Sequence, residues 1–148
     1  MLSRLWPNEG ATHILYPMMA LVALTFAVLL LIPYQRFKAG REGRVSADDF
    51  RFGESSRVPP EVSVPNRNLI NLLEMPVLFY VACLTAYVTH AVSGTLVGLA
   101  WAYVALRLAH SAVHLTYNKV MHRLTLYAES NAVLVVIWVR LFLSLLRG

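Results

Sequence analysis

The sequence predicts an all-α integral membrane protein, a single domain over residues 1–148 that forms a bundle of four transmembrane helices. Hydrophobic residues make up 57% of the chain and charged residues only 14%, whereas a soluble domain carries roughly 25% charged residues. The apolar residues also gather into four runs, each close to the roughly 20 residues that a membrane-spanning helix needs. Composition and spacing together exclude a soluble globular protein.

The first predicted span covers residues 14–32 and ends at Pro33. Cations follow this apolar run instead of preceding it, which is the reverse of a secretory signal peptide, so we expect a retained helix. The connection that follows, residues 35–65, carries six Lys and Arg residues against five Asp and Glu residues. Within it, Ser46 and Asp49 have the spacing of a capping box and predict the start of a short helix.

The second predicted span covers residues 66–90 and begins after Pro65, since proline is common in the first turn of a helix. Pro76 lacks the amide hydrogen that would bond to the Leu72 carbonyl in a continuous helix, so a kink or an additional free acceptor is expected beside Glu74. The two remaining predicted spans cover residues 94–117 and 124–146. An even number of spans places both termini on the same side of the membrane.

The distribution of Lys and Arg predicts the orientation of the chain. The 35–65 connection has six of them and the join before the fourth span has Lys119 and Arg123, whereas residues 90–95 have none and the N-terminal tail has only Arg4. Because cytoplasmic loops are enriched in Lys and Arg, we expect the basic connections in the cytoplasm and both termini outside it, as in a bacterial inner membrane. This topology also accounts for the net charge of +5, so we expect membrane lipid as a partner and no nucleic acid.

Polar side chains recur at helical spacing inside the last three spans, although ionisable groups at membrane depth cost at least a few kcal/mol each. Residues three or four positions apart share one helix face. In the second span these residues are Arg67, Asn71 and Glu74. In the third span they are Tyr103, Arg107, His110, His114 and Tyr117, opposite a stripe of small residues at Gly98, Ala102, Ala105, Ala109 and Ala112. The fourth span begins with Arg123 and Tyr127, followed by Ser130 or Asn131.

The predicted topology brings these polar faces to the cytoplasmic ends of their helices, where they can form one pocket. Arginine guanidinium groups bind carboxylates in a planar, two-pronged geometry, and a carboxylate such as Glu74 binds an ammonium group. The set therefore suits a small zwitterion with several carboxylates. The alternative is that Glu74 pairs with Arg67 or Arg107 and only holds the bundle together.

A metal or haem site is not expected from the histidines. His110 and His114 lie one turn apart, with Glu74 as a conceivable third ligand, yet no cysteine pair and no HExxH motif accompanies them. For haem, these two histidines share one helix, so they are badly placed to bind opposite faces of one ring. No metal is predicted.

Three segments match a known pattern: RNLINLLEMP, which contains Arg67, Asn71 and Glu74, RLAHSAVH, which contains Arg107, His110 and His114, and HRLTLY, which contains Arg123 and Tyr127. In these segments and over all four spans the sequence resembles the MAPEG family, the membrane-associated proteins in eicosanoid and glutathione metabolism. It departs from the family pattern at Ile70, where some members have arginine, at His114, where the family has tyrosine, and at Leu124, where one branch has serine.

The resemblance implies a homotrimer that binds glutathione between neighbouring subunits. It implies that Arg123 is catalytic and stabilises the glutathione thiolate, and that Asn71, Glu74, His110 and Tyr127 bind the peptide. The other ligand-binding residues it implies are Arg67, Arg107 and His114, and at the end of the first span Arg36 or Arg41, with Lys38 nearby.

The function that the resemblance implies is a membrane-embedded, glutathione-dependent transferase or peroxidase that acts on lipophilic electrophiles arriving from the bilayer. The alternative is a non-catalytic membrane protein of the same fold that binds lipid or supports a larger membrane complex.

Overall fold

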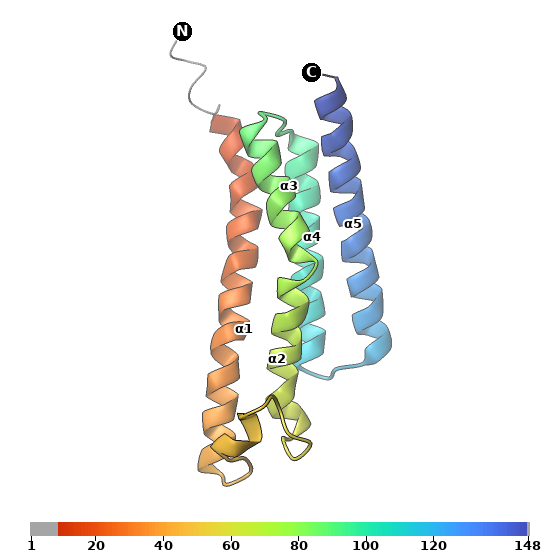
Figure 1. Ribbon diagram of the computed structural model, residues 1–148. Helices are drawn as coiled ribbons and strands as arrows, with labels where there is room; N and C mark the ends of the chain where they lie inside the picture. Colours follow the sequence, from red (N-terminus) through yellow and green to blue (C-terminus); the bar gives the residue numbers. More distant parts are fainter. Residues whose placement is uncertain (1–8, 148) are drawn as a thin grey trace.

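The computed structural model describes residues 9–147, so Arg4 of the topology argument lies outside the described residues. The chain is all-helical, and no strand forms within this range (Figure 1). In chain order the elements are η2 (Glu9–Ile14), α1 (Leu15–Arg41), η3 (Ala47–Phe50), α2 (Pro60–Leu73), α3 (Pro76–Val88), α4 (Gly94–Leu115) and α5 (Val120–Leu146). The predicted fold class, a four-helix membrane bundle, is confirmed, with α2 and α3 together forming the second span.

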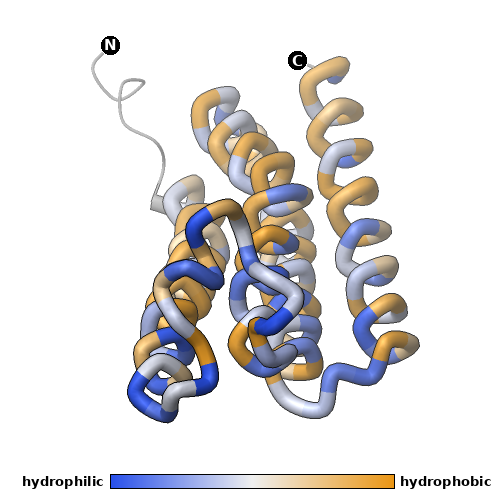
Figure 2. The backbone as a smooth tube through the Cα atoms, turned by 60° about the horizontal axis from the view of Figure 1, so that its bottom comes forward, coloured by the Kyte–Doolittle hydropathy of each residue, from blue (hydrophilic) through white to orange (hydrophobic). Residues whose placement is uncertain are grey.

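Four helical segments are long and apolar enough to cross a membrane: Gly10–Arg41, Pro60–Val88, Gly94–Leu115 and Val120–Leu146. Their outward faces expose large apolar side chains, among them Met19 at 62%, Phe26 at 59% and Leu30 at 68% exposure on α1. Lipid covers such a surface without the free-energy cost that water imposes. Figure 2 shows hydrophobic residues along the helices and hydrophilic residues concentrated around the connections at one end of the bundle.

The helices run beyond the predicted spans at several ends. Helix α1 does not end at Pro33 but continues to Arg41, and α2 begins at Pro60, so that Pro65 lies inside it. The apolar run marks the part of a helix that needs lipid, whereas the helix itself can extend into the polar headgroup region. A proline there removes one backbone hydrogen bond, which one long, packed helix tolerates.

The predicted kink in the second span is confirmed. Helix α2 ends at Leu73, Glu74 leaves the helical conformation with ψ of −92°, and Pro76 occupies the first turn of α3. A proline at a helix start has no amide hydrogen to leave unpaired. The kink therefore separates the polar half of this span from its apolar half.

The bundle core is apolar and is formed by α1, α3, α4 and α5 together with Leu72 of α2. Its largest buried side chains include Leu21, Phe79 and Leu134, and the rings of Phe79 and Tyr103 stack with centroids 4.6 Å apart. Cys83 is a buried free thiol within this core. The start of α1 and the end of α5 lie at one end of the bundle, and the α1–α2 and α4–α5 connections lie at the other (Figure 1).

The connection between α1 and α2 is folded around the Asp49 carboxylate. This buried group accepts hydrogen bonds from the backbone N–H of Ser46 at 2.8 Å, from the Ser46 hydroxyl at 3.0 Å and from the Ser55 hydroxyl at 2.7 Å, and it pairs with Arg57 at 3.1 Å. These hydrogen bonds and the nearby guanidinium favour the ionised form and lower the pKa of Asp49 from 3.8 to about 2. The short helix predicted after Ser46 is present as η3.

Candidate functional site

A pocket of about 220 Å³ opens where α2, α4 and α5 approach one another near the α4–α5 join. Its polar lining is Asn71 from α2, His110 from α4, and Arg123 and Tyr127 from α5. These are four of the eight site residues predicted from the sequence. Val120 and Leu124 complete the lining, so one wall of the pocket is apolar.

Arg123 is held by the join that precedes α5. Its Nη1 donates a hydrogen bond of 2.7 Å to Oδ1 of Asn118. Asn118 adopts a positive φ of 48°, a conformation that asparagine tolerates better than most residues. The turn between α4 and α5 thus fixes the Arg123 guanidinium at the mouth of the pocket, where it is only half-buried.

Arg107 lies behind the pocket and is completely buried, at 0% exposure. Its Nε donates to the Tyr103 hydroxyl at 3.1 Å and its Nη2 donates to Oδ1 of Asn131 at 2.9 Å. The guanidinium carbon also lies 5.0 Å from the ring centroid of Tyr127, a cation–π distance. Nη1 has no acceptor among the described residues, so this buried cation retains a free donor beside the pocket.

The two histidines follow each other along α4. The ring centroids of His110 and His114 lie 5.8 Å apart, and His110 lies 6.0 Å from the Tyr127 ring. His114 is buried next to the pocket without lining it, and its Nδ1 has no hydrogen-bond partner within residues 9–147. In the same range no three His, Cys, Asp or Glu residues form a group that could hold a metal ion.

Arg67 and Glu74 do not reach the pocket within one chain. Both side chains are exposed, and the ion pairs that form between residues 9 and 147 all lie around the α1–α2 connection. Within residues 9–147 of one chain, Glu74 forms no ion pair with Arg67 or Arg107. Because α2 ends at Leu73, the helical spacing that placed Glu74 on the face of Asn71 no longer applies.

Of the predicted cations at the end of α1, Arg36 has a structural contact. Its Nη2 pairs with Glu54 at 3.0 Å, and its guanidinium carbon lies 4.3 Å from the Phe50 ring centroid. These contacts attach the connection to α1. Neither Arg36 nor Arg41 lines the pocket that contains Arg123.

Among the polar contacts that the sequence did not predict, one joins α2 and α4. The Ser111 hydroxyl donates to Oδ1 of Asn68 at 3.3 Å, and both residues are buried between α4 and α2. Helical spacing gave a signal for this contact. Ser111 lies one turn after Arg107, and Asn68 lies one turn before Leu72, so each residue falls on a face of its helix that is buried. The contact joins the two helices directly beside the candidate site.

The fold and the site define a class: a four-helix integral membrane protein with an arginine-containing polar pocket near one end of its bundle. The MAPEG family model matches residues 14–143, so the chain belongs to the MAPEG family. Membership supports, for the family as a whole, a membrane-associated function related to glutathione or eicosanoids. Comparison with curated proteins and with solved structures returned no match.

Proposed function

We propose that this protein is a glutathione-dependent transferase or peroxidase that acts on lipophilic electrophiles within the membrane. The observation that carries the proposal is the pocket in which Arg123 lies together with Asn71, His110 and Tyr127. These groups offer a cation, an amide, an imidazole and a phenol, which match the carboxylates and peptide groups of a small zwitterion.

Arg123 would act on the glutathione sulfur. A guanidinium about 4 Å from a thiolate stabilises the charged form by about 4 kcal/mol at the effective dielectric constant of a protein surface. The pKa of the thiol falls accordingly, and the thiolate fraction at neutral pH rises. The thiolate sulfur then forms a C–S bond with an electrophilic carbon, whose leaving group departs with the bonding electron pair. With a peroxide it attacks one oxygen and breaks the O–O bond, which gives an alkoxide and a glutathione sulfenic acid that a second glutathione converts to the disulfide and water.

The remaining residues of the site would bind the rest of the peptide. Asn71, His110 and Tyr127 supply neutral hydrogen bonds. Arg107 and His114 do not line the pocket and would act through their neighbours: the Arg107 guanidinium lies 5.0 Å from the Tyr127 ring centroid and positions that ring, and His114 packs next to His110. Val120 and Leu124 line the pocket and are also exposed at 64% and 56%, so a lipophilic substrate can enter beside them from the bilayer.

A homotrimer would complete the site. Arg67 and Glu74 are exposed on the second span, where direct contact with lipid costs several kcal/mol. A neighbouring subunit that covers them removes this cost and can direct both groups toward glutathione. The small residues Ala102, Ala105 and Ala112 are also exposed on α4, and such stripes permit close approach of another membrane helix.

The orientation follows from the same proposal. The basic connection between α1 and α2 and the α4–α5 join lie at the end of the bundle that holds the pocket (Figure 1). In a bacterial inner membrane these connections face the cytoplasm, so the pocket opens toward the compartment that supplies glutathione, and the two termini lie outside.

Thermal stabilisation of the detergent-purified protein by glutathione and its S-alkyl analogues tests this function. At a ligand concentration of about 100 times Kd, selective binding stabilises the folded state by about 2.7 kcal/mol. We expect Asn71→Leu to reduce the stabilisation and Asn66→Leu, the same change on the same helix outside the pocket, to preserve it. No stabilisation of the wild type by any of these ligands would contradict the proposal and favour the non-catalytic alternative.

A further inference from the structure

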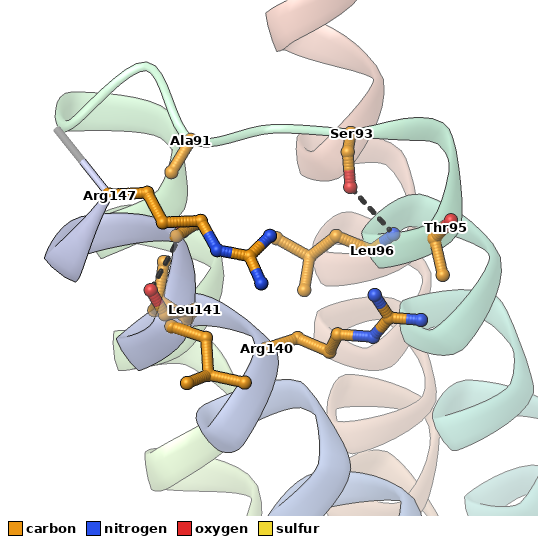
Figure 3. A pocket seen from close by; sticks show the side chains of 9 residues that line it. Ala91, Ser93, Thr95, Leu96, Arg140, Leu141 and Arg147 are labelled. Atoms are coloured by element: carbon orange, nitrogen blue, oxygen red, sulfur yellow. Dashed lines mark hydrogen bonds between the residues drawn. The ribbon is translucent and has the colours of Figure 1, made fainter.

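A second polar pocket lies at the opposite end of the bundle, between the α3–α4 connection and the last turns of α5. It has a volume of about 290 Å³, and two arginines, Arg140 and Arg147, contribute to its lining (Figure 3). Ser93, Thr95 and Ser144 add hydroxyl groups, and none of the described residues that line the pocket is acidic. Nothing in the proposed glutathione chemistry uses these residues.

The two arginines act on the same space. Arg140 lies in the last turns of α5, and Arg147 is the residue that caps its C-terminus, seven positions later and still in a helical conformation, so both lie on one face. Figure 3 shows both guanidinium groups directed from α5 toward the first turn of α4. Neither forms an ion pair within the part of the chain that the structure describes. Each guanidinium brings five N–H donors and cannot lose its charge, so the pair favours an anion.

The start of α4 adds to the positive potential of this pocket. Ser93 caps the helix, and its hydroxyl oxygen accepts a hydrogen bond of 3.2 Å from the backbone N–H of Leu96. The other N–H groups of the first turn lack acceptors inside the helix, and the helix dipole is positive at this end. Two guanidinium groups and a helix N-terminus thus face one pocket, and residues 9–147 place no acidic side chain in its lining.

The depth of the arginines matches the position of lipid phosphates. At 1.5 Å per residue, Arg140 lies about 26 Å and Arg147 about 36 Å along α5 from Arg123. The hydrocarbon core of a bilayer is about 30 Å thick. With Arg123 near one boundary, the two arginines bracket the other boundary, where headgroup phosphates lie.

The apolar part of the lining distinguishes a lipid from a free anion. Leu96, Leu141 and Leu143 line the same pocket, and Leu143 is 43% exposed. Leu96 and Leu141 are themselves buried, so an acyl chain would pack against the exposed side of Leu143 while its phosphate remains at the guanidinium groups. We propose that this pocket binds the phosphate headgroup of an anionic phospholipid. The proposal is independent of glutathione binding at the other end of the bundle.

Native mass spectrometry of the full-length protein tests this site, with phosphatidylglycerol added in nonionic detergent and phosphatidylcholine as the zwitterionic comparison. We expect the wild type to bind phosphatidylglycerol in preference. Arg140→Gln and Arg147→Gln should each weaken this binding about tenfold, because each removes charge-assisted hydrogen bonds to the phosphate. The matched control is Arg51→Gln, which changes an exposed arginine in the α1–α2 connection.

A second variant keeps the test independent of any folding defect in the arginine variants. Thr95→Glu places a carboxylate in the first turn of α4, which stabilises the helix but repels a phosphate from the pocket. We expect this variant to fold and to lose selective phosphatidylglycerol binding. Unchanged binding in Thr95→Glu or in the double arginine variant, or equal binding of both lipids by the wild type, overturns the proposal.

Inorganic phosphate separates the two sources of the anion. If phosphate displaces phosphatidylglycerol at concentrations comparable to those of the lipid, the pocket is a site for small anions and the lipid assignment is wrong. If phosphate competes only at much higher concentrations, the apolar lining contributes to binding, as the proposal requires.

Discussion

The hydrogen bond between Arg107 and Asn131 provides a quantitative test of the bundle around the candidate site. Arg107 is fully buried, and the 2.9 Å bond from its Nη2 to Oδ1 of Asn131 joins α4 to α5. Asn131→Ala removes this acceptor. Nη2 then loses its acceptor, and because Nη1 already has none among the described residues, two nitrogens of one buried cation are left without a partner.

The expected loss of stability can be placed between two ranges for the free energy of a hydrogen bond. A hydrogen bond to a charged group contributes about 1.5 to 3 kcal/mol in a folded protein. Hydrogen bonds between membrane helices average about 0.6 kcal/mol and reach about 1.7 kcal/mol, because helices separated in the membrane find other partners. Charge and complete burial place this bond at the upper end of the membrane range. We therefore expect Asn131→Ala to lower the free energy of unfolding by about 1.5 kcal/mol.

Unfolding in mixed micelles with increasing sodium dodecyl sulfate, followed by circular dichroism, measures this change. Thr125→Ala is the control, because its hydroxyl donates to the Met121 carbonyl on the same helix at an exposed position. Asn131→Asp should be at least as stable as the wild type, since it provides Arg107 with a carboxylate. Equal stability of Asn131→Ala and Thr125→Ala, or a larger loss for Asn131→Asp than for Asn131→Ala, would refute the reasoning.

Three further predictions concern the connections. The pKa of Asp49 is lowered from 3.8 to about 2, so the stability that its carboxylate contributes is complete above pH 3.8 and is lost as the pH falls through 2. In the wild type, pepsin cleavage of the α1–α2 connection should therefore increase as the pH falls through this window. Asp49→Asn should abolish that pH dependence. Both Asn118→Ala and Asn118→Gly lose the hydrogen bond to Arg123. In the same unfolding assay the alanine variant should be about 1 kcal/mol less stable than the glycine variant, because position 118 has a left-handed backbone conformation that alanine adopts at a cost. Equal stability of the two variants would contradict this. In bacterial cells, Phe52→Cys in a Cys83→Ser background should react with a membrane-impermeant maleimide only after the cytoplasm is opened, and labelling of intact cells would reverse the orientation.

The sequence was sufficient to predict the fold because lipid imposes a strict requirement on the backbone. A chain in the hydrocarbon core must satisfy every backbone hydrogen bond internally, so four apolar runs become four helices. The kink at Glu74 followed from Pro76 alone, which is a local effect. The helix boundaries predicted at Pro33 and Pro65 are wrong. The preference of proline for helix ends cannot tell the end of a helix from a helix that continues beyond the apolar run.

The candidate site was predictable in part, for a related reason. Helical spacing correctly grouped Arg107, His110 and His114 on one buried face of α4, and the predicted topology, with the polar faces at one end of the bundle, brought Asn71 of α2 together with His110. The partners of these residues depend on contacts distant in sequence. The bond between Ser111 and Asn68 joins residues 43 positions apart, and no periodicity within one helix specifies such a pair.

The central claim is that Arg123 and its neighbours bind glutathione as a thiolate. Ultraviolet difference spectroscopy during titration of the purified protein with glutathione measures the thiolate directly. We predict a saturable thiolate band for the wild type, its loss in Arg123→Leu, and its retention in His122→Leu, which changes the adjacent exposed residue that contacts Tyr117. A band of equal intensity in Arg123→Leu, or no band in the wild type at saturating glutathione, would contradict the claim.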